Sequence, residues 1–190
     1  MALGCAGWVI VRGGLLNYTA VGNELAPYRQ ISSFLRLAIV GPLHGDWWKL
    51  FTSQFAYLNG LYAFVALLAT GIFGWLLERR HGPIVALAVF LGGGITGALL
   101  ACAVYTEPVV SGANGAALAL VAAWSAPDLR AAVRGYYYEG DLLGAGAVAA
   151  VLLVLPYARS EASWLAGVVG AIFGLLAGAG LRAINPPQEL

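Results

Sequence analysis

Residues able to do acid–base, nucleophilic or metal chemistry are scarce in this chain. Its 190 residues include only two histidines, His44 and His81, and both lie in links between apolar segments. The two cysteines, Cys5 and Cys102, lie within apolar runs, which argues against a disulfide framework and against a thiolate metal site. We therefore expect no cofactor and no bound metal.

The interiors of the apolar segments hold uncharged polar residues only: Asn59, Tyr62, Thr70, Thr96, Asn114 and Ser125. Proton relays, ion-coupled transport and carboxylate-ligated metals require ionisable groups at membrane depth, so these functions are excluded. Asn114 is the most conspicuous, because Gly112 and Gly115 flank it and allow another backbone to approach closely. Its simplest structural role is an interhelical hydrogen bond, worth about 0.6–2 kcal/mol in a membrane.

The composition determines what kind of elements must position these residues. Hydrophobic residues make up 61% of the chain, charged residues 10%, and the mean hydropathy is +0.81. A soluble domain is about 45–50% apolar and about 25% charged, so the chain is predicted to be an all-α polytopic membrane protein in contact with lipids. A net charge of +1 excludes nucleic acid as a partner, because phosphate recognition needs concentrated basic surface.

Charged residues mark the ends of the expected membrane spans, each of which needs about 20 apolar residues. The full spans are predicted at 50–77, 83–105, 109–126, 142–158 and 162–184. Residues 1–16 contain an apolar run too short to cross, interpreted as a partial first span; a signal peptide is the alternative, but no basic residues precede the run. Residues 17–49 form a long loop holding an interfacial or a water-exposed helix, and 185–190 form a tail. The expected architecture is one six-helix bundle, 1–190, with its first span short or truncated.

Arginine distribution predicts the orientation of this bundle. Links 78–82 and 127–141 and the end of the last span are expected on one side, and they carry Arg79, Arg80, Arg130, Arg134 and Arg182. The short links on the other side hold only Arg159. The positive-inside tendency then places both termini in the cytoplasm. The Ala/Gly/Leu-rich composition, without a recognisable targeting segment, favours a prokaryotic inner membrane.

Small residues are expected to form the contacts between the spans. Gly170-Ala-Ile-Phe-Gly174 is a G-x-x-x-G pattern, which lets helix backbones approach closely in lipid. A tight intramolecular bundle is the favoured use of this pattern, and a dimer contact is the alternative.

Residues 42–180 resemble the rhomboid intramembrane serine proteases, six-helix bundles in which the fourth span carries the nucleophile in G-x-S-G. The sixth span of that family supplies the histidine base, and the second carries H-x-x-x-N near the oxyanion site. The matching stretches occur in the family's order: Trp47-Trp48-Lys49-Leu50-Phe51-Thr52, Phe73-Gly74-Trp-Leu-Leu-Glu78-Arg79 with Gly82, Gly112-Ala-Asn-Gly115-Ala116, and Ala166-Gly167-Val-Val-Gly170 followed by Gly174.

The resemblance carries the fold but not the catalytic residues. Asn114 falls at the nucleophile position and Gly167 at the base position, while the H-x-x-x-N positions fall on Tyr62 and Ala66, and an earlier histidine position falls on Tyr57. A carboxamide cannot replace an activated hydroxyl, and nucleophilic catalysis needs a base within hydrogen-bond reach. Oxyanion stabilisation, worth several kcal/mol, is largely lost as well.

The resemblance thus implies a non-catalytic pseudoprotease that binds or scaffolds a transmembrane partner, alone or as a subunit of a membrane complex. We expect its binding groove to include Asn114, Tyr62, Ser111, Gly112 and Gly115, with Asn114 and Tyr62 hydrogen-bonded to each other or to the partner helix.

Two alternatives remain open from the sequence. The first is an active, atypical rhomboid protease that uses Ser111 with His44, which lies on the same predicted side of the membrane. The second is a purely structural subunit of a larger membrane complex.

Overall fold

The computed structural model describes residues 35–158 and 162–184. The expected partial first span, most of the long loop and the tail lie outside these residues. The elements follow in this order: β1 (Ile39–Val40), α3 (Lys49–Thr52), the 3-10 turn η1 (Ser53–Phe55), α4 (Gly60–His81), α5 (Pro83–Val104), β2 (Val109–Val110), α6 (Asn114–Val133), α7 (Leu142–Ala158) and α8 (Trp164–Ile184).

Long apolar helices dominate the fold. The helices α4, α5, α6 and α8 are each long and apolar enough to cross a membrane, and α7 is an apolar helix of 17 residues. The prediction of an all-α polytopic membrane protein is therefore confirmed.

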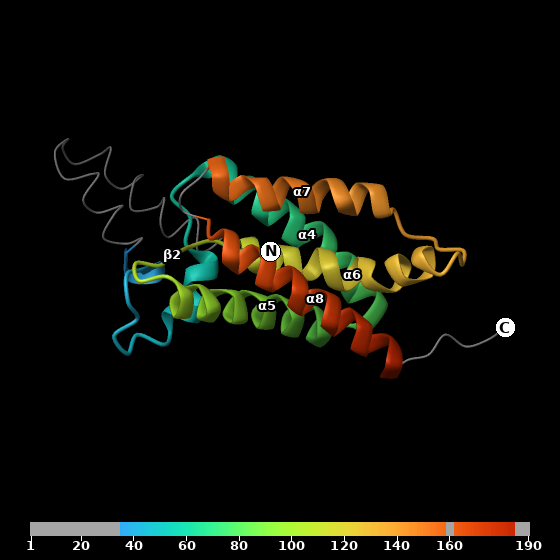
Figure 1. Ribbon diagram of the computed structural model, residues 1–190, viewed down its shortest axis with the longest axis horizontal. Coiled ribbons are helices and arrows are strands. Elements are labelled where there is room, and N and C mark those ends of the chain that lie inside the picture. Colours follow the sequence, from blue (N-terminus) through green and yellow to red (C-terminus); the bar gives the residue numbers. More distant parts are fainter. Residues whose placement is uncertain (1–34, 159–161, 185–190) are drawn as a thin grey trace.

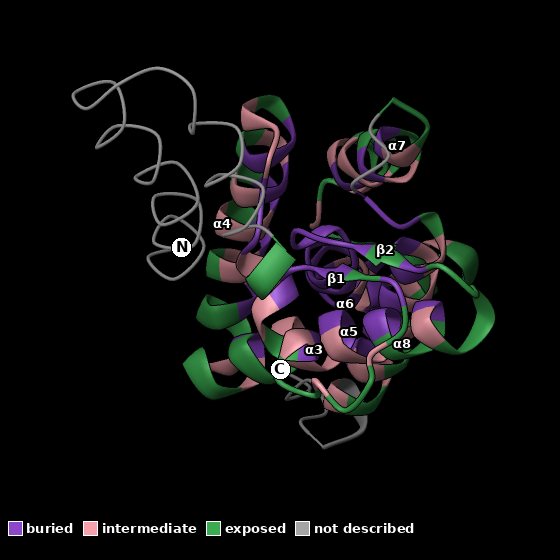
Figure 2. Cartoon of the chain, turned by 90° about the vertical axis from the view of Figure 1, so that its left-hand side faces the viewer, coloured by how far each residue is buried: buried purple, intermediate pink, exposed green. Residues whose placement is uncertain are grey.

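Helix α6 forms the centre of the bundle. It contacts α4, α5, α7 and α8, which surround it in Figure 1. Its membrane-spanning stretch has the largest buried share of the four long helices, and buried residues concentrate around it in Figure 2. Residues at the start of α6 are consequently enclosed by protein and not by lipid.

A row of glycines brings α8 against α6. A Cβ atom added to Gly170 would collide with the Gly115 backbone, and one added to Gly174 would collide with the Ala119 backbone. Gly178 lies against the Ala123 carbonyl in the same way. These glycines therefore serve close helix packing within the chain.

Hydropathy predicts a span that begins at Leu50, but in the structure α4 begins at Gly60. Ala56 is extended, and Asn59 caps the helix by accepting hydrogen bonds from the Leu61 and Tyr62 backbone N–H groups at 3.0 and 3.2 Å. This capping geometry starts a new helix and separates it from α3 and η1.

The central helix also differs from its expected range of 109–126. β2 and a turn precede it, and it continues through Pro127 to Val133. Proline removes one backbone hydrogen bond but does not end the helix here. Asp128 therefore lies inside α6, close to its end.

A short strand pair was not predicted at all. β1 and β2 pair antiparallel, with Ile39 opposite Val110 and Val40 opposite Val109. Next to the pair, the Gly41 N–H donates to the Pro108 carbonyl at 2.9 Å. The pair joins the loop before α3 to the segment that leads into α6.

Candidate functional site

Asn114 and Gly167 lie face to face between α6 and α8. Asn114 is the first residue of α6 and is only 2% exposed. A Cβ atom added to Gly167 would lie 2.9 Å from Asn114 Nδ2 and 3.1 Å from Leu118 Cδ1. The structure thus brings together the residues that the resemblance places at the nucleophile and base positions. The Asn114 amide occupies the space that a side chain at residue 167 would enter.

The amide of Asn114 forms no hydrogen bond within the described residues, although both of its polar atoms are buried. The expected interhelical hydrogen bond is therefore not made. The physical reason is that the facing residue, Gly167, offers no side chain, and the hydroxyl of Tyr62 is directed elsewhere.

Tyr62 holds the turn before α6. Its hydroxyl donates to the Ser111 carbonyl at 2.7 Å, and the Asn114 amide has no partner among the described residues, so the expected hydrogen bond between these two side chains is not made. Gly112 adopts a φ of +70° and lies so close to the Tyr62 ring that an added Cβ would be 2.6 Å from Cε1. Only glycine combines this backbone conformation with this approach.

Two further hydrogen bonds complete the support of this turn. The Ala113 N–H donates to the Tyr57 hydroxyl at 3.0 Å, and the Gly112 N–H donates to the Ser53 carbonyl at 2.7 Å. The rings of Tyr57 and Tyr62 pack edge to face with centroids 5.4 Å apart. Tyr57 and Tyr62, which the resemblance places at histidine positions of the family, therefore act as buried supports, a role that the sequence did not indicate.

The expected binding groove is not open. All five of its expected residues are buried: Asn114, Tyr62, Ser111, Gly112 and Gly115. Ala66 is buried as well. The close packing of α8 on α6 and the tyrosine-supported turn enclose these residues. Their role in binding a partner stays a prediction.

Ser111 and His44 differ in exposure. Ser111 is 1% exposed, whereas His44 is exposed in a turn, with a φ of +42°. The His44 Nδ1 atom lies 2.8 Å from the Pro42 carbonyl oxygen. Across residues 35–158 and 162–184, no three His, Cys, Asp or Glu side chains gather in a group that could hold a metal ion.

An apolar groove of about 490 Å³ opens between α4 and α5, and the sequence did not predict it. Its lining comes from α3, η1, α4, α5 and the start of α6, and includes Phe51, Tyr57, Thr70, Trp75, Phe90 and Ala113. We call this feature the α4–α5 groove. Since Tyr57 and Ala113 also belong to the supported turn, one end of the groove adjoins the site.

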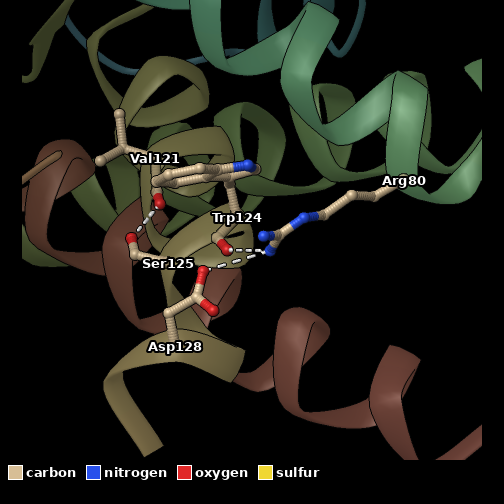
Figure 3. Close-up of polar contacts among 5 residues, drawn as sticks. All are labelled: Arg80, Val121, Trp124, Ser125 and Asp128. Atoms are coloured by element: carbon tan, nitrogen blue, oxygen red, sulfur yellow. Dashed lines mark hydrogen bonds and ion pairs between the residues drawn. The ribbon is translucent and has the colours of Figure 1, made fainter. Parts of the chain in front are cut away.

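A polar contact joins α4 to α6 at the opposite end of the bundle (Figure 3). The Arg80 Nη1 atom lies 3.3 Å from Asp128 Oδ2 and 3.4 Å from the Trp124 carbonyl oxygen. The guanidinium also lies 5.2 Å from the centre of the Trp124 ring. The sequence did not indicate this contact, because the expected span 109–126 ends before Asp128, whereas α6 continues to Val133.

Together, the central helix α6 and the apolar helices around it define a polytopic membrane protein. A family model described as Rhomboid domain matches residues 44–184, and the chain belongs to the rhomboid family. No curated protein was found to match the chain.

Proposed function

We propose that this chain is a non-catalytic rhomboid-family protein that binds the transmembrane segment of a partner. We place it in a prokaryotic inner membrane, with cytoplasmic termini, where it acts alone or as a subunit of a membrane complex. The observation that carries the proposal is the pairing of Asn114 with Gly167.

The chemistry of this pair supports inactivity. The nitrogen lone pair of a carboxamide is delocalised into its carbonyl, so Asn114 is a poor nucleophile. A nucleophile also needs a base within hydrogen-bond reach, and Gly167 has no side chain to act as one. His44 lies on an exposed turn and His81 ends α4, so neither replaces the missing base.

The retained framework supports a binding role. Tyr57 and Tyr62 hold the turn before α6 in a fixed shape, and the glycine row of α8 keeps the bundle closed. A closed core with intact packing provides a rigid surface for another membrane segment. The partner then binds on the outside of the bundle.

A fluorophosphonate probe tests the absence of catalysis. We expect the purified protein in phospholipid vesicles to remain unlabelled, while an active serine hydrolase added to the same vesicles is labelled. Labelling that disappears in Ser111→Ala would establish the alternative, an atypical protease using Ser111, and would overturn the proposal.

Purification in mild detergent, followed by mass spectrometry, tests partner binding. A stoichiometric partner with at least one membrane span is the expected result. Recovery of the chain as a lone monomer under all mild conditions would count against a stable complex.

A further inference from the structure

A second apolar groove, of about 260 Å³, runs over α6 between α7 and α8. In Figure 1, α7 and α8 lie on either side of α6 and diverge toward the end of the bundle where α6 ends. Leu118 and Ala145 are buried at the floor of the groove, whereas Leu129, Gly146 and Leu175 are exposed at its rim. We call this feature the α6–α7 groove.

The α6–α7 groove is about as long as one leaflet is thick. Its lining runs from Leu118 to Leu129 along α6 and from Leu142 to Leu153 along α7, which is a step of 11 residues on each helix. At about 1.5 Å per residue each step covers about 16 Å, close to half of the roughly 30 Å of hydrocarbon in a bilayer. The groove therefore begins at one membrane surface, beside the loop between α6 and α7, and ends near the middle of the bilayer.

The lining is apolar and requires no hydrogen bond from an occupant. Its polar side chain is that of Ser125, and this hydroxyl already donates to the Val121 carbonyl in the same helix. None of the buried polar atoms that lack a partner in the described part of the chain belongs to this lining. An α-helix of this length and about 10 Å diameter occupies roughly 1,300 Å³, so a helix cannot enter the groove. A single acyl chain fits its length and its apolar character.

Two arginines lie at the end of the groove that meets the membrane surface. Arg130 directly follows Leu129 of the lining, and Arg134 follows one turn later as the C-cap of α6. Both are exposed, and neither forms an ion pair with the residues that the structure describes. Arginine binds phosphate through charge-assisted, often bidentate hydrogen bonds. The charge at this end therefore complements the phosphate of a lipid whose acyl chain enters the groove.

The loop at residues 134–141 borders the same end. It contains two carboxylates, Glu139 and Asp141, and that of Asp141 accepts a hydrogen bond at 2.8 Å that caps the first turn of α7. Tyr136 and Tyr137 are 68% and 89% exposed, and tyrosine side chains are typical of the headgroup layer of a membrane. The loop therefore suits the depth at which lipid phosphates lie.

From the one-leaflet length, the apolar lining and the two arginines, we propose that the α6–α7 groove binds an anionic phospholipid. One acyl chain lies between α7 and α8, and the phosphate contacts Arg130 and Arg134. The lipid belongs to the leaflet at which α6 ends, whichever side of the membrane that leaflet faces. This site does not depend on whether the chain is catalytic, so it goes beyond the proposed function.

Photocrosslinking from the lipid tests the site. The purified protein is placed in phosphatidylcholine vesicles that contain a small fraction of phosphatidylglycerol with a diazirine in one acyl chain, and mass spectrometry locates the crosslinked residues. Ala149→Phe places a ring in the groove, because Ala149 lines it. Ala147→Phe, at an exposed residue of α7 outside the lining, is the matched control. We expect crosslinks concentrated on the lining, most of which Ala149→Phe abolishes and Ala147→Phe leaves unchanged.

Competition with unlabelled lipids tests the arginines. Phosphatidylglycerol should displace the probe at lower concentration than added phosphatidylcholine does. Replacing both arginines (Arg130→Gln with Arg134→Gln) should weaken phosphatidylglycerol binding about thirtyfold, which corresponds to about 1 kcal/mol for each arginine. Arg79→Gln removes a charge at the same end of the bundle, from a side chain that stacks on Trp75, and should change binding little. The arginine variants leave the lining intact, so they test the site even if Ala149→Phe does not fold.

Four results would overturn the proposal. The first three are uniform labelling of all lipid-facing helices, equal yields from Ala149→Phe and Ala147→Phe, and equal competition by the two lipids. The fourth is a p-benzoylphenylalanine at Leu175, on the rim, that crosslinks to residues 1–34 or 185–190 or to a second copy and not to lipid. None of these results bears on catalysis or on a protein partner. Fluorophosphonate labelling would refute the proposed function and leave this lipid site standing.

Discussion

The side-chain amide of Asn114 fills the space in front of Gly167, where an added Cβ atom would lie 2.9 Å from the amide nitrogen. A larger residue at 114 and the smallest residue at 167 are therefore complementary in volume. If the resemblance aligns these positions correctly, the two differences from a rhomboid protease act as one change in packing, and we expect that reversing either alone disturbs the contact between α6 and α8.

Restoring the base position alone should destabilise the protein. Gly167→His would force its side chain into the Asn114 amide and Leu118, and we expect a lower unfolding midpoint in detergent. Adding Asn114→Ser should recover part of the loss, with a coupling of about 1–3 kcal/mol between the two sites. Additive effects would show that the residues do not share this space.

The same double variant should not cleave a fluorescent transmembrane substrate efficiently. The resemblance places Tyr62 and Ala66 at the family's oxyanion-stabilising positions, and Tyr62 already donates to the Ser111 carbonyl. Efficient turnover, measured against the wild type in the same vesicles, would show that residues 114 and 167 alone separate this chain from an active protease.

Removing the unpaired amide should stabilise the bundle. Asn114→Leu replaces two buried polar atoms without partners by methyl groups of similar volume, and each unsatisfied group costs about 1–3 kcal/mol. We expect a higher thermal midpoint for Asn114→Leu and a lower one for Asn114→Asp, which would bury a charge. A marked fall for the leucine variant would reveal a hydrogen bond that Asn114 makes in the membrane.

The Tyr62 hydroxyl should contribute measurably to stability. Tyr62→Phe leaves the Ser111 carbonyl without this donor, which should cost about 1–3 kcal/mol at a buried site. Tyr157→Phe, at a tyrosine that is mostly exposed, serves as the matched control and should change little. Equal midpoints for both variants would argue against a supporting role of Tyr62.

The glycine row can be tested within one helix. An alanine at Gly170 would collide with the Gly115 backbone, whereas nothing lies within 4 Å of a Cβ at Gly180. We expect Gly170→Ala to cost about 1–3 kcal/mol and Gly180→Ala to be neutral or slightly stabilising, as helix propensity predicts. A destabilising Gly180→Ala would point to a general intolerance of α8.

Composition was enough to predict the fold class, because a chain so poor in charge must surround its backbone with lipid or with other helices. The ranges of α5 and α7 also followed closely from the positions of charged and turn-forming residues. The start of α4 did not, since hydropathy stays high from Leu50 onward and cannot register the extended Ala56.

Less of the site could be predicted. The resemblance indicated which positions to compare, but only the three-dimensional arrangement shows that the Asn114 amide fills the space before Gly167. The strand pair is too short for alternating hydrophobicity to appear in the sequence. The α4–α5 groove depends on how two helices diverge, and this is determined by side chains on several elements at once.

The pairing of Ile39 with Val110 has a consequence for membrane insertion. Two residues can pair in this way only on the same side of the bilayer, so the chain between them must cross an even number of times. α4 and α5, the long apolar helices between them, must therefore insert together as a hairpin. If α5 fails to cross, β2 emerges on the wrong side and the turn before α6 cannot form.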